Sequence, residues 1–184
     1  SIVQSEKILS RSDAVLALHF PLDEDDIQRA RERIAFEEVF CLLLAAQLNK
    51  QANMQLDGWS IPFDKTTVQR FVKSLPFDLT NAQRRAAWDI IQDFEKSIPM
   101  NRLLQGDVGS GKTAVAGLAA LQASTAGFQS AIMAPTEILA SQHAETLREM
   151  LQPFNVTVGL LTGSVKGKAR QALYGKIADG SVDV

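Results

Sequence analysis

The sequence is poor in several features that mark particular classes of protein. It has one cysteine in 184 residues, which excludes an internal disulfide. Cys41 lies in an apolar stretch, so we expect a reduced, buried thiol there, not a nucleophile or metal ligand. The longest apolar run, Val39 to Ala46, is far shorter than the ~20 residues that a membrane helix needs. Ser1 to Ser10 also lack a signal-peptide pattern. We therefore expect a cytoplasmic protein without a membrane segment.

Neither sign of charge dominates the chain. Nineteen Lys and Arg against 21 Asp and Glu give a formal net charge of −2. This balance argues against a protein whose whole surface clamps nucleic acid. The last segment is locally basic, with Lys166, Lys168, Arg170 and Lys176. An acidic block at residues 23–26 is typical of a helix start, where carboxylates favour the positive end of the dipole.

Residues 1–74 have the pattern of an all-helical section. Apolar residues recur near helical spacing between residues 23 and 54, which predicts one long helix. That helix needs a packing partner for its apolar positions, which include Ile27, Ala30, Ile34, Cys41, Leu44, Ala45 and Leu48. Gly58 and Pro62 interrupt the pattern, and a second helix is predicted over residues 64–74.

Residues 75–184 alternate between strand and helix patterns. Strands are predicted at residues 102–105, 129–134, 156–161 and 182–184. Helices are predicted at residues 81–96, 114–126, 137–151 and 168–178. This alternation is typical of an α/β fold in which crossover helices join parallel strands. Because the pattern stops inside a strand, we expect an incomplete sheet.

A glycine-rich loop between a strand and a helix predicts a nucleotide site. It fits the phosphate-loop pattern G-x-x-x-x-G-K-[ST]. Glycines let successive backbone N–H groups point inward, and the helix adds its positive end. Lys112 would reach the β and γ phosphates, and the Thr113 hydroxyl would bind a Mg²⁺. The expected phosphate-binding residues are Gly106, Asp107, Val108, Gly109, Ser110, Gly111, Lys112 and Thr113.

Gln83 has two interpretations, which are compatible. In the first, Thr80 caps the helix that follows it and Gln83 reaches back to the Thr80 N–H, as in a capping box. In the second, the Gln83 carboxamide pairs with the adenine edge and selects ATP over GTP. The same side chain can hold the loop in one state and read the base in another.

Two further segments lie at predicted strand exits. Pro135 and Thr136 follow one strand, and Thr162, Gly163 and Ser164 follow the next. Because ligands bind at the carboxyl ends of parallel strands, we expect both segments on the edge that carries the phosphate loop. Taken singly, each is more typical of a helix cap or a turn.

Together, the segments PFDLTNAQ, LLQGDVGSGKT, APTEILASQH and LLTGSVKGKAR resemble the first half of a superfamily 2 helicase motor. The sequences of these segments are most similar to those of the RecG family of bacterial branched-DNA helicases. The resemblance implies a P-loop NTPase fold of the RecA-like type. It makes residues 75–184 the first part of the first motor domain. More weakly, over residues 14–48, it makes residues 1–74 a helical connector between a DNA-binding wedge domain and that motor.

The resemblance also assigns roles to residues. Gln83 would contact adenine, the phosphate loop would bind ATP and Mg²⁺, and a set of strand-exit residues would grip the DNA backbone. That set is Pro135, Thr136, Thr162, Gly163 and Ser164. Lys166, Lys168 and Arg170 could add phosphate contacts, although for any one of them a solvated basic helix face is the safer interpretation. His143 is expected to be a partly buried packing residue.

For the intact protein, the resemblance implies a monomeric, ATP-driven translocase. It would remodel branched double-stranded DNA such as stalled forks and Holliday junctions, in repair and recombination. This stretch carries no acidic Walker B motif and no arginine finger, which is worth roughly 10³ to 10⁵ in rate in related enzymes. We therefore expect it to bind nucleotide with little or no hydrolysis. Its partners would be the wedge and the remaining motor of the same chain.

Three alternatives remain open. Another superfamily 2 translocase with the same loop wording, such as a transcription-repair coupling factor, would differ in its flanking domains. A small-molecule kinase would use the same loop but would need a lid and an acceptor site, which the sequence does not show. A non-catalytic nucleotide-binding module would bind Mg-ATP without any effect of nucleic acid.

Overall fold

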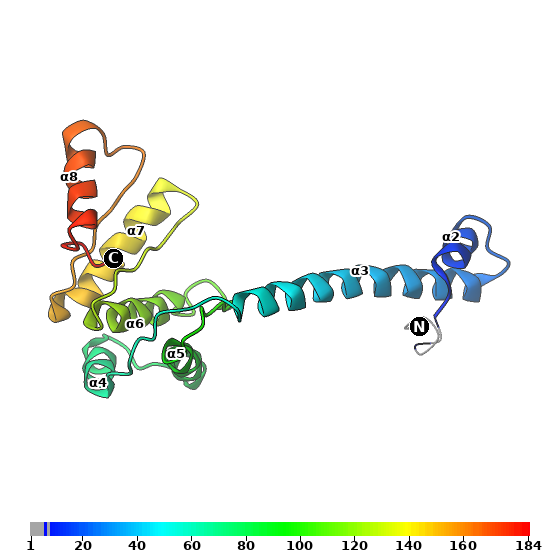
Figure 1. Cartoon of the computed structure of the whole chain (residues 1–184), viewed down its shortest axis with the longest axis horizontal. Coiled ribbons are helices and arrows are strands. Elements are labelled where there is room, and N and C mark those ends of the chain that lie inside the picture. Colours follow the sequence, from blue (N-terminus) through cyan, green and yellow to red (C-terminus); the bar gives the residue numbers. More distant parts are fainter. Residues whose placement is uncertain (1–5, 7) are drawn as a thin grey trace. The chain divides into compact units, whose positions relative to one another are not determined.

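The computed structural model describes residues 6 and 8–184. Residues 1–5 and 7, part of the stretch in which the sequence lacks a signal pattern, lie outside the described residues. The chain divides into two compact units, residues 1–56 and 57–184 (Figure 1). The division of domains at residue 75 stays a prediction.

The first unit is a pair of helices. In it, α2 (Arg11–His19) packs against α3 (Glu24–Asn53), and the side chains of Ser10 and Asp23 cap them. The long helix was predicted from the sequence and is confirmed, whereas α2 was not predicted. Ala14 and Ala30 are fully buried between the two helices.

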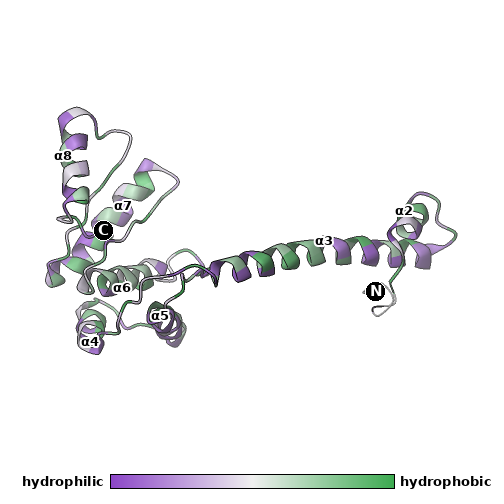
Figure 2. Ribbon diagram, viewed as in Figure 1, coloured by the Kyte–Doolittle hydropathy of each residue, from purple (hydrophilic) through white to green (hydrophobic). Residues whose placement is uncertain are grey.

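Most of α3 lies outside that contact. Its buried residues, Ala30 and Arg33, are both in its N-terminal half. The expectation of a buried Cys41 is wrong, because this thiol is exposed. Of the predicted apolar stripe only Ala30 is buried, since α2 covers only the N-terminal part of the helix. Figure 2 shows many hydrophobic residues along the C-terminal half of α3. No helix among the described residues is long and apolar enough to cross a membrane.

The second unit contains the other predicted helices, each within two or three residues of the expected bounds. They are α4 (Lys65–Ser74), α5 (Asn81–Phe94), α6 (Lys112–Thr125), α7 (Glu137–Leu151) with the short η1 (Gln152–Phe154), and α8 (Gly167–Ala178). Helix α6 contacts α4, α5 and α7, and Figure 1 shows it between α4 and α5 on one side and α7 on the other.

A single hydrophobic core forms around α6. Its buried members come from helices α4 to α7 and are Phe71, Ala87, Ile91, Val115, Leu118, Leu121, Leu147 and Leu151. Gly117, in the middle of α6, lets Phe71, Leu147 and Met150 approach the helix backbone. Because α6 begins with the phosphate loop, the same packing holds that loop against the core.

Polar side chains fix where these helices begin. The Asp64 carboxylate accepts hydrogen bonds from Thr66 N (2.9 Å), Thr67 N (3.1 Å) and Thr67 Oγ1 (2.6 Å). The backbone N–H of Asp64 donates to Gln122 Oε1 of α6 at 3.1 Å. Asp64 therefore both caps α4 and ties it to α6.

The segment that enters the phosphate loop is tied to α5 by charge. Arg102 Nε donates to Asp93 Oδ2, and Lys96 Nζ donates to Asp93 Oδ1 at 2.6 Å. The bond from Arg102, followed by the bond from Lys96, lowers the pKa of Asp93 below its ordinary value. This pairing fixes the chain at residue 102, four residues before the loop begins.

The predicted strands are not found among the described residues, and this expectation is corrected here. Backbone pairing is short: Ser130 N donates to Asp183 O (2.7 Å), Asp183 N to Thr157 O (2.9 Å) and Gly159 N to Val184 O (2.8 Å). Residues 182–184 therefore lie between the other two segments. A strand needs a continued ladder of such bonds, and three residues supply too few.

We expect Phe71→Ala to lower the free energy of unfolding of the chain by about 3–5 kcal/mol, because it leaves a cavity beside α6. Phe71 is fully buried. Phe77→Ala is the matched control, since Phe77 is 47% exposed and its loss should cost far less. Urea denaturation measures both, and equal losses would show that the core is not centred on Phe71.

The Asp64 cap should give α4 a pH-dependent stability. Bonds from Thr67 favour the charged form and lower the pKa of Asp64 from its ordinary value of 3.8. The stabilisation that the charged Asp64 cap gives is therefore complete at pH values above the unfolded-state pKa. It is lost as the pH falls through the lower folded-state pKa. We expect the stability gap between Asp64→Asn and the original chain to be full at pH 7 and to shrink below about pH 4. Urea denaturation across this range tests it, and a gap that is constant with pH would contradict it.

Candidate nucleotide and nucleic-acid site

The phosphate loop has the backbone shape that its glycines predict. Gly109 and Gly111 both have φ of +78°, a region that side chains disfavour. Gly111 is the N-cap of α6, and no side chain caps the first-turn N–H groups of that helix. These groups and the positive end of the helix dipole form an anion site. The loop therefore fits a nucleotide phosphate.

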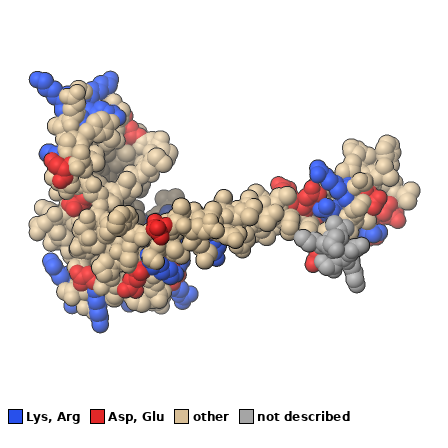
Figure 3. Space-filling view, viewed as in Figure 1, with Lys and Arg blue, Asp and Glu red and all other residues tan. Residues whose placement is uncertain are grey.

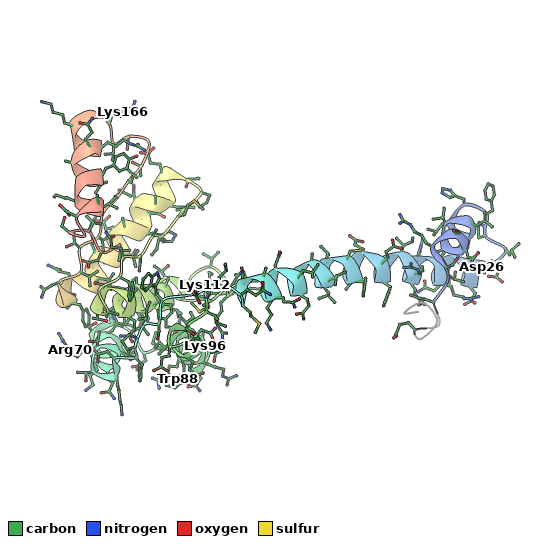
Figure 4. The ribbon with its side chains drawn as sticks, in the orientation of Figure 1. Asp26, Arg70, Trp88, Lys96, Lys112 and Lys166 are labelled. Carbon is green, nitrogen blue, oxygen red and sulfur yellow. The ribbon has the colours of Figure 1, made fainter. Side chains whose placement is uncertain are left out.

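Lys112 lies folded against the loop. Its Nζ donates to the carbonyl oxygens of Gly106 (2.7 Å) and Asp107 (2.8 Å), and Figure 4 labels this side chain. The ammonium is thereby held inside the curve of the backbone. Phosphate oxygens are stronger acceptors than these carbonyls, so the same group can transfer to a ligand with little movement. Thr113 follows on the first turn of α6 and is half-buried.

Gln83 connects α5 to the phosphate loop. Its Oε1 accepts from Thr80 N (2.7 Å), and Thr80 Oγ1 accepts from Gln83 N (3.2 Å), so the predicted capping box is confirmed. Its Nε2 donates to Ser110 O at 2.7 Å. A Cβ at position 111 would collide with the Gln83 amide, a second reason for glycine there. One side chain thus binds the helix start and the loop together.

The described residues offer no protein-only metal cluster. No group of three or more His, Cys, Asp or Glu side chains in that part of the chain could hold a metal ion. Mg²⁺ usually keeps water and phosphate ligands and takes only one or two from the protein. The Thr113 hydroxyl, one residue after Lys112, fits that second pattern.

The two strand-exit segments meet at the start of α7. Thr136 Oγ1 caps the helix by accepting from Leu139 N at 3.3 Å. Glu137, the first residue of α7, accepts from Ser164 N at 3.1 Å and from Ser164 Oγ. Ser164 Oγ lies 2.7 Å from Thr162 Oγ1. The two segments therefore meet through Glu137 and Ser164, whereas the role of Thr136, Thr162 and Ser164 in binding DNA stays a prediction.

Glu137 is a residue that the sequence analysis missed. Bonds from Ser164 and then from Thr162 lower the pKa of its carboxyl below the ordinary value. A carboxylate at the first position of a helix is explained by the dipole alone, so the sequence gave no reason to look for a second partner. Only the fold shows that residues 137 and 164 are in contact.

The basic residues near α8 differ in direction. Lys166 and Lys168 are exposed, and Figures 3 and 4 show basic side chains at the end of α8 where Lys166 lies. Arg170 instead turns inward: Nη1 lies 3.4 Å from both Thr162 O and Val165 O, and Nε donates to Tyr174 Oη at 2.8 Å. Its guanidinium also lies over the Tyr174 ring.

A cavity of about 480 Å³ lies between α7 and α8, and its lining is mainly apolar. His143 lines it and is half-buried, which confirms the expected packing role. Neither Gln83 nor any phosphate-loop residue lines this cavity. It is therefore separate from the candidate nucleotide site.

Comparisons with known proteins agree with these motifs. The family described as DEAD/DEAH box helicase matches residues 80–184. ATP-dependent DNA helicase RecG from Bacillus subtilis (strain 168) is 44% identical over 182 residues, which are 98% of this chain and 27% of the relative. RecG from Thermotoga maritima is 43% identical over 183 residues, 100% of this chain and 24% of the relative.

A solved structure of RecG bound to a three-way DNA junction has a TM-score of 0.85 and 43% identity. The match covers 100% of this chain and 25% of that one. The chain thus spans about a quarter of the length of these relatives. The family match and the structural match confirm the predicted P-loop NTPase fold class and the resemblance to RecG. On its motifs and on the match over residues 80–184, the chain belongs to the DEAD/DEAH box helicase family.

Proposed function

We propose that this chain is the nucleotide-binding part of an ATP-driven translocase that remodels branched double-stranded DNA, such as stalled forks and Holliday junctions. The observation that carries the proposal is the contact between Gln83 and the phosphate loop, in which one carboxamide spans a helix cap and Ser110. A group with both a donor and an acceptor suits the adenine edge. ATP is therefore the nucleotide that fits best.

When bound, the nucleotide supplies the phosphoryl chemistry, and this chain supplies its cradle. We propose that the first-turn N–H groups of α6 and the Lys112 ammonium hold the phosphates. Thr113 would contribute a hydroxyl to the Mg²⁺ beside them. We assign the four extended segments of residues 102–184 to a RecA-like parallel sheet, which the bonds of Asp183 with Ser130 and Thr157 support.

The DNA-facing part of the proposal concerns the strand exits. Pro135 and Thr136 precede Glu137, which bonds to Ser164 next to Thr162 and Gly163, and this contact supports a shared DNA-facing surface to which exposed Lys168 would add. Contacts of this kind reach the phosphodiester backbone and carry no base sequence. The resulting grip suits a motor that recognises the shape of a junction and moves along any sequence.

Hydrolysis requires more than this stretch. Phosphoryl transfer in related enzymes uses a carboxylate that places the water and an arginine finger worth roughly 10³ to 10⁵ in rate. We propose that both come from the remainder of a longer protein, because the relatives are about four times as long. The chain by itself would bind nucleotide with little turnover.

In the full-length protein that contains this chain, we expect ATP hydrolysis to be stimulated most by forked DNA, less by linear duplex and least without DNA. Steady-state phosphate release with the three substrates measures this. Lys112→Ala is the matched control and should abolish turnover, since its ammonium is the group held at the loop. Equal stimulation by linear duplex would indicate a general translocase. No stimulation at all would leave a nucleotide-binding module.

We expect Gln83→Ala to lower the ratio of ATP affinity to GTP affinity by about tenfold, because the lost carboxamide is the group that would pair with the adenine edge. Thr80→Ala is the control, since it breaks the same capping box but keeps the carboxamide. It should cost about 1 kcal/mol of stability and leave nucleotide preference unchanged. Nucleotide affinities by calorimetry decide the matter. Equal losses for ATP and GTP would mean that Gln83 only supports the loop.

A further inference from the structure

The turn at residues 162–164 is held by a carboxylate. Ser164 offers two donors, its backbone N–H and its hydroxyl, and Glu137 accepts both. Because the single Ser164 hydroxyl proton goes to Glu137, the Thr162 hydroxyl proton goes either to Ser164 Oγ, 2.7 Å away, or to the Glu137 carboxylate. Both hydroxyl protons of the turn are therefore used inside the protein.

That assignment leaves two backbone donors of the turn open among the described residues, the N–H groups of Thr162 and Gly163, and of these two residues only Gly163 is exposed. The backbone N–H of Gly163 makes no hydrogen bond within the part of the chain that the structure describes, and Gly163 is exposed. A Cβ at this position would meet nothing within 4 Å. Gly163 is thus open on the side where a side chain would lie and its N–H has no partner in the described part of the chain, whereas the donors of Ser164 are occupied.

The carbonyl groups of the turn are held by Arg170. Its Nη1 reaches the carbonyl oxygens of Thr162 and Val165 at 3.4 Å. Tyr174, one helical turn later, fixes the guanidinium through its hydroxyl at 2.8 Å and through its ring. A guanidinium reaches the two carbonyls and the hydroxyl from separate nitrogens of a rigid fork, whereas a lysine would have to make all three bonds from a single nitrogen.

We propose that Glu137 and Arg170 are positioning residues that hold the 162–165 turn, Glu137 through its donors and Arg170 through its carbonyl groups, so that the Gly163 N–H faces a DNA phosphate. Ser164 belongs to this support and is not itself a phosphate ligand. The inference rests on the proposed function, because it takes DNA as the ligand of the turn. Under this proposal Arg170 does not contact a DNA phosphate, whereas Lys168 does.

Glu137 provides the sharpest test, because two ideas predict opposite signs. If its charge only repels DNA, or only competes with phosphate for the donors of Ser164, its removal strengthens DNA binding. If it positions the turn, Glu137→Ala weakens binding, by about tenfold for a lost charged hydrogen bond. Glu137→Gln keeps an acceptor oxygen and should restore affinity to within about threefold.

The measurement is binding of a synthetic three-way DNA junction to the full-length protein, by fluorescence anisotropy. Ser164→Ala should weaken binding as Glu137→Ala does. Thermal unfolding of each variant is followed in parallel, because a purely structural effect would lower the melting temperature with no change in affinity. Unchanged or tighter binding by Glu137→Ala would overturn the proposal.

Arg170 is tested through the salt dependence of binding. A side chain that contacts a phosphate contributes about 0.9 to the slope of log affinity against log salt. Lys168→Ala, the control, should reduce the slope by about that amount. Arg170→Ala and Arg170→Lys should both weaken binding with the slope unchanged. A reduced slope for Arg170→Ala, or full affinity for Arg170→Lys, would show direct contact and contradict the proposal.

These measurements distinguish a failure of the proposed function from a failure of the positioning proposal. If the original protein does not bind the junction, the proposed function itself is wrong. If it binds the junction but the Glu137 and Arg170 variants behave as direct or repulsive contacts, only the positioning proposal is wrong.

Discussion

The whole second unit depends on one constraint on α6, which has to be buried along its flanks and open at its N-terminus. Leu118 and Leu121 show the first half of that constraint, since both lie in the core that α6 shares with α4, α5 and α7. Gly111 shows the second, because it starts the helix without a side-chain cap. Burial of α6 removes apolar surface from water and fixes its axis. The free N–H groups of its first turn are therefore aimed by the packing of the core.

Helices α4, α5 and α7 of this unit start with a side-chain cap, and the residues at these starts do more than begin a helix. Orphan N–H groups at a helix start need acceptors, which short polar side chains supply. Asp64 also joins α6 through Gln122, and Gln83 also joins the phosphate loop through Ser110. Glu137 at the start of α7 joins the turn at Ser164 in the same way. Residues at the helix starts, which help to satisfy the first N–H groups of their own helices, therefore also connect neighbouring segments of the unit.

Local rules explain which features could be predicted from the sequence. Helix bounds follow from periodicity and capping within a few residues, so α3 and α7 lie where expected. The loop shape follows from its glycines. Strand pairing, the exposure of Cys41 and the inward turn of Arg170 depend on residues far away in sequence or on the next turn of a helix. Tyr174 decides the direction of Arg170, and no pattern distinguishes that arginine from Lys168 beforehand.

The distinction between Arg170 and Lys168 also bears on how a chain of net charge −2 would bind DNA under the proposed function. A strong positive field is absent, so affinity has to come from a few donors at defined positions. A backbone N–H such as that of Gly163 has no side-chain entropy to lose, but it is only as well aimed as the turn that carries it. Under the proposed function, internal hydrogen bonds that fix such a turn would therefore contribute to binding without touching DNA. Arginine suits this internal role through its fork, and lysine suits contact with a phosphate as a mobile point charge.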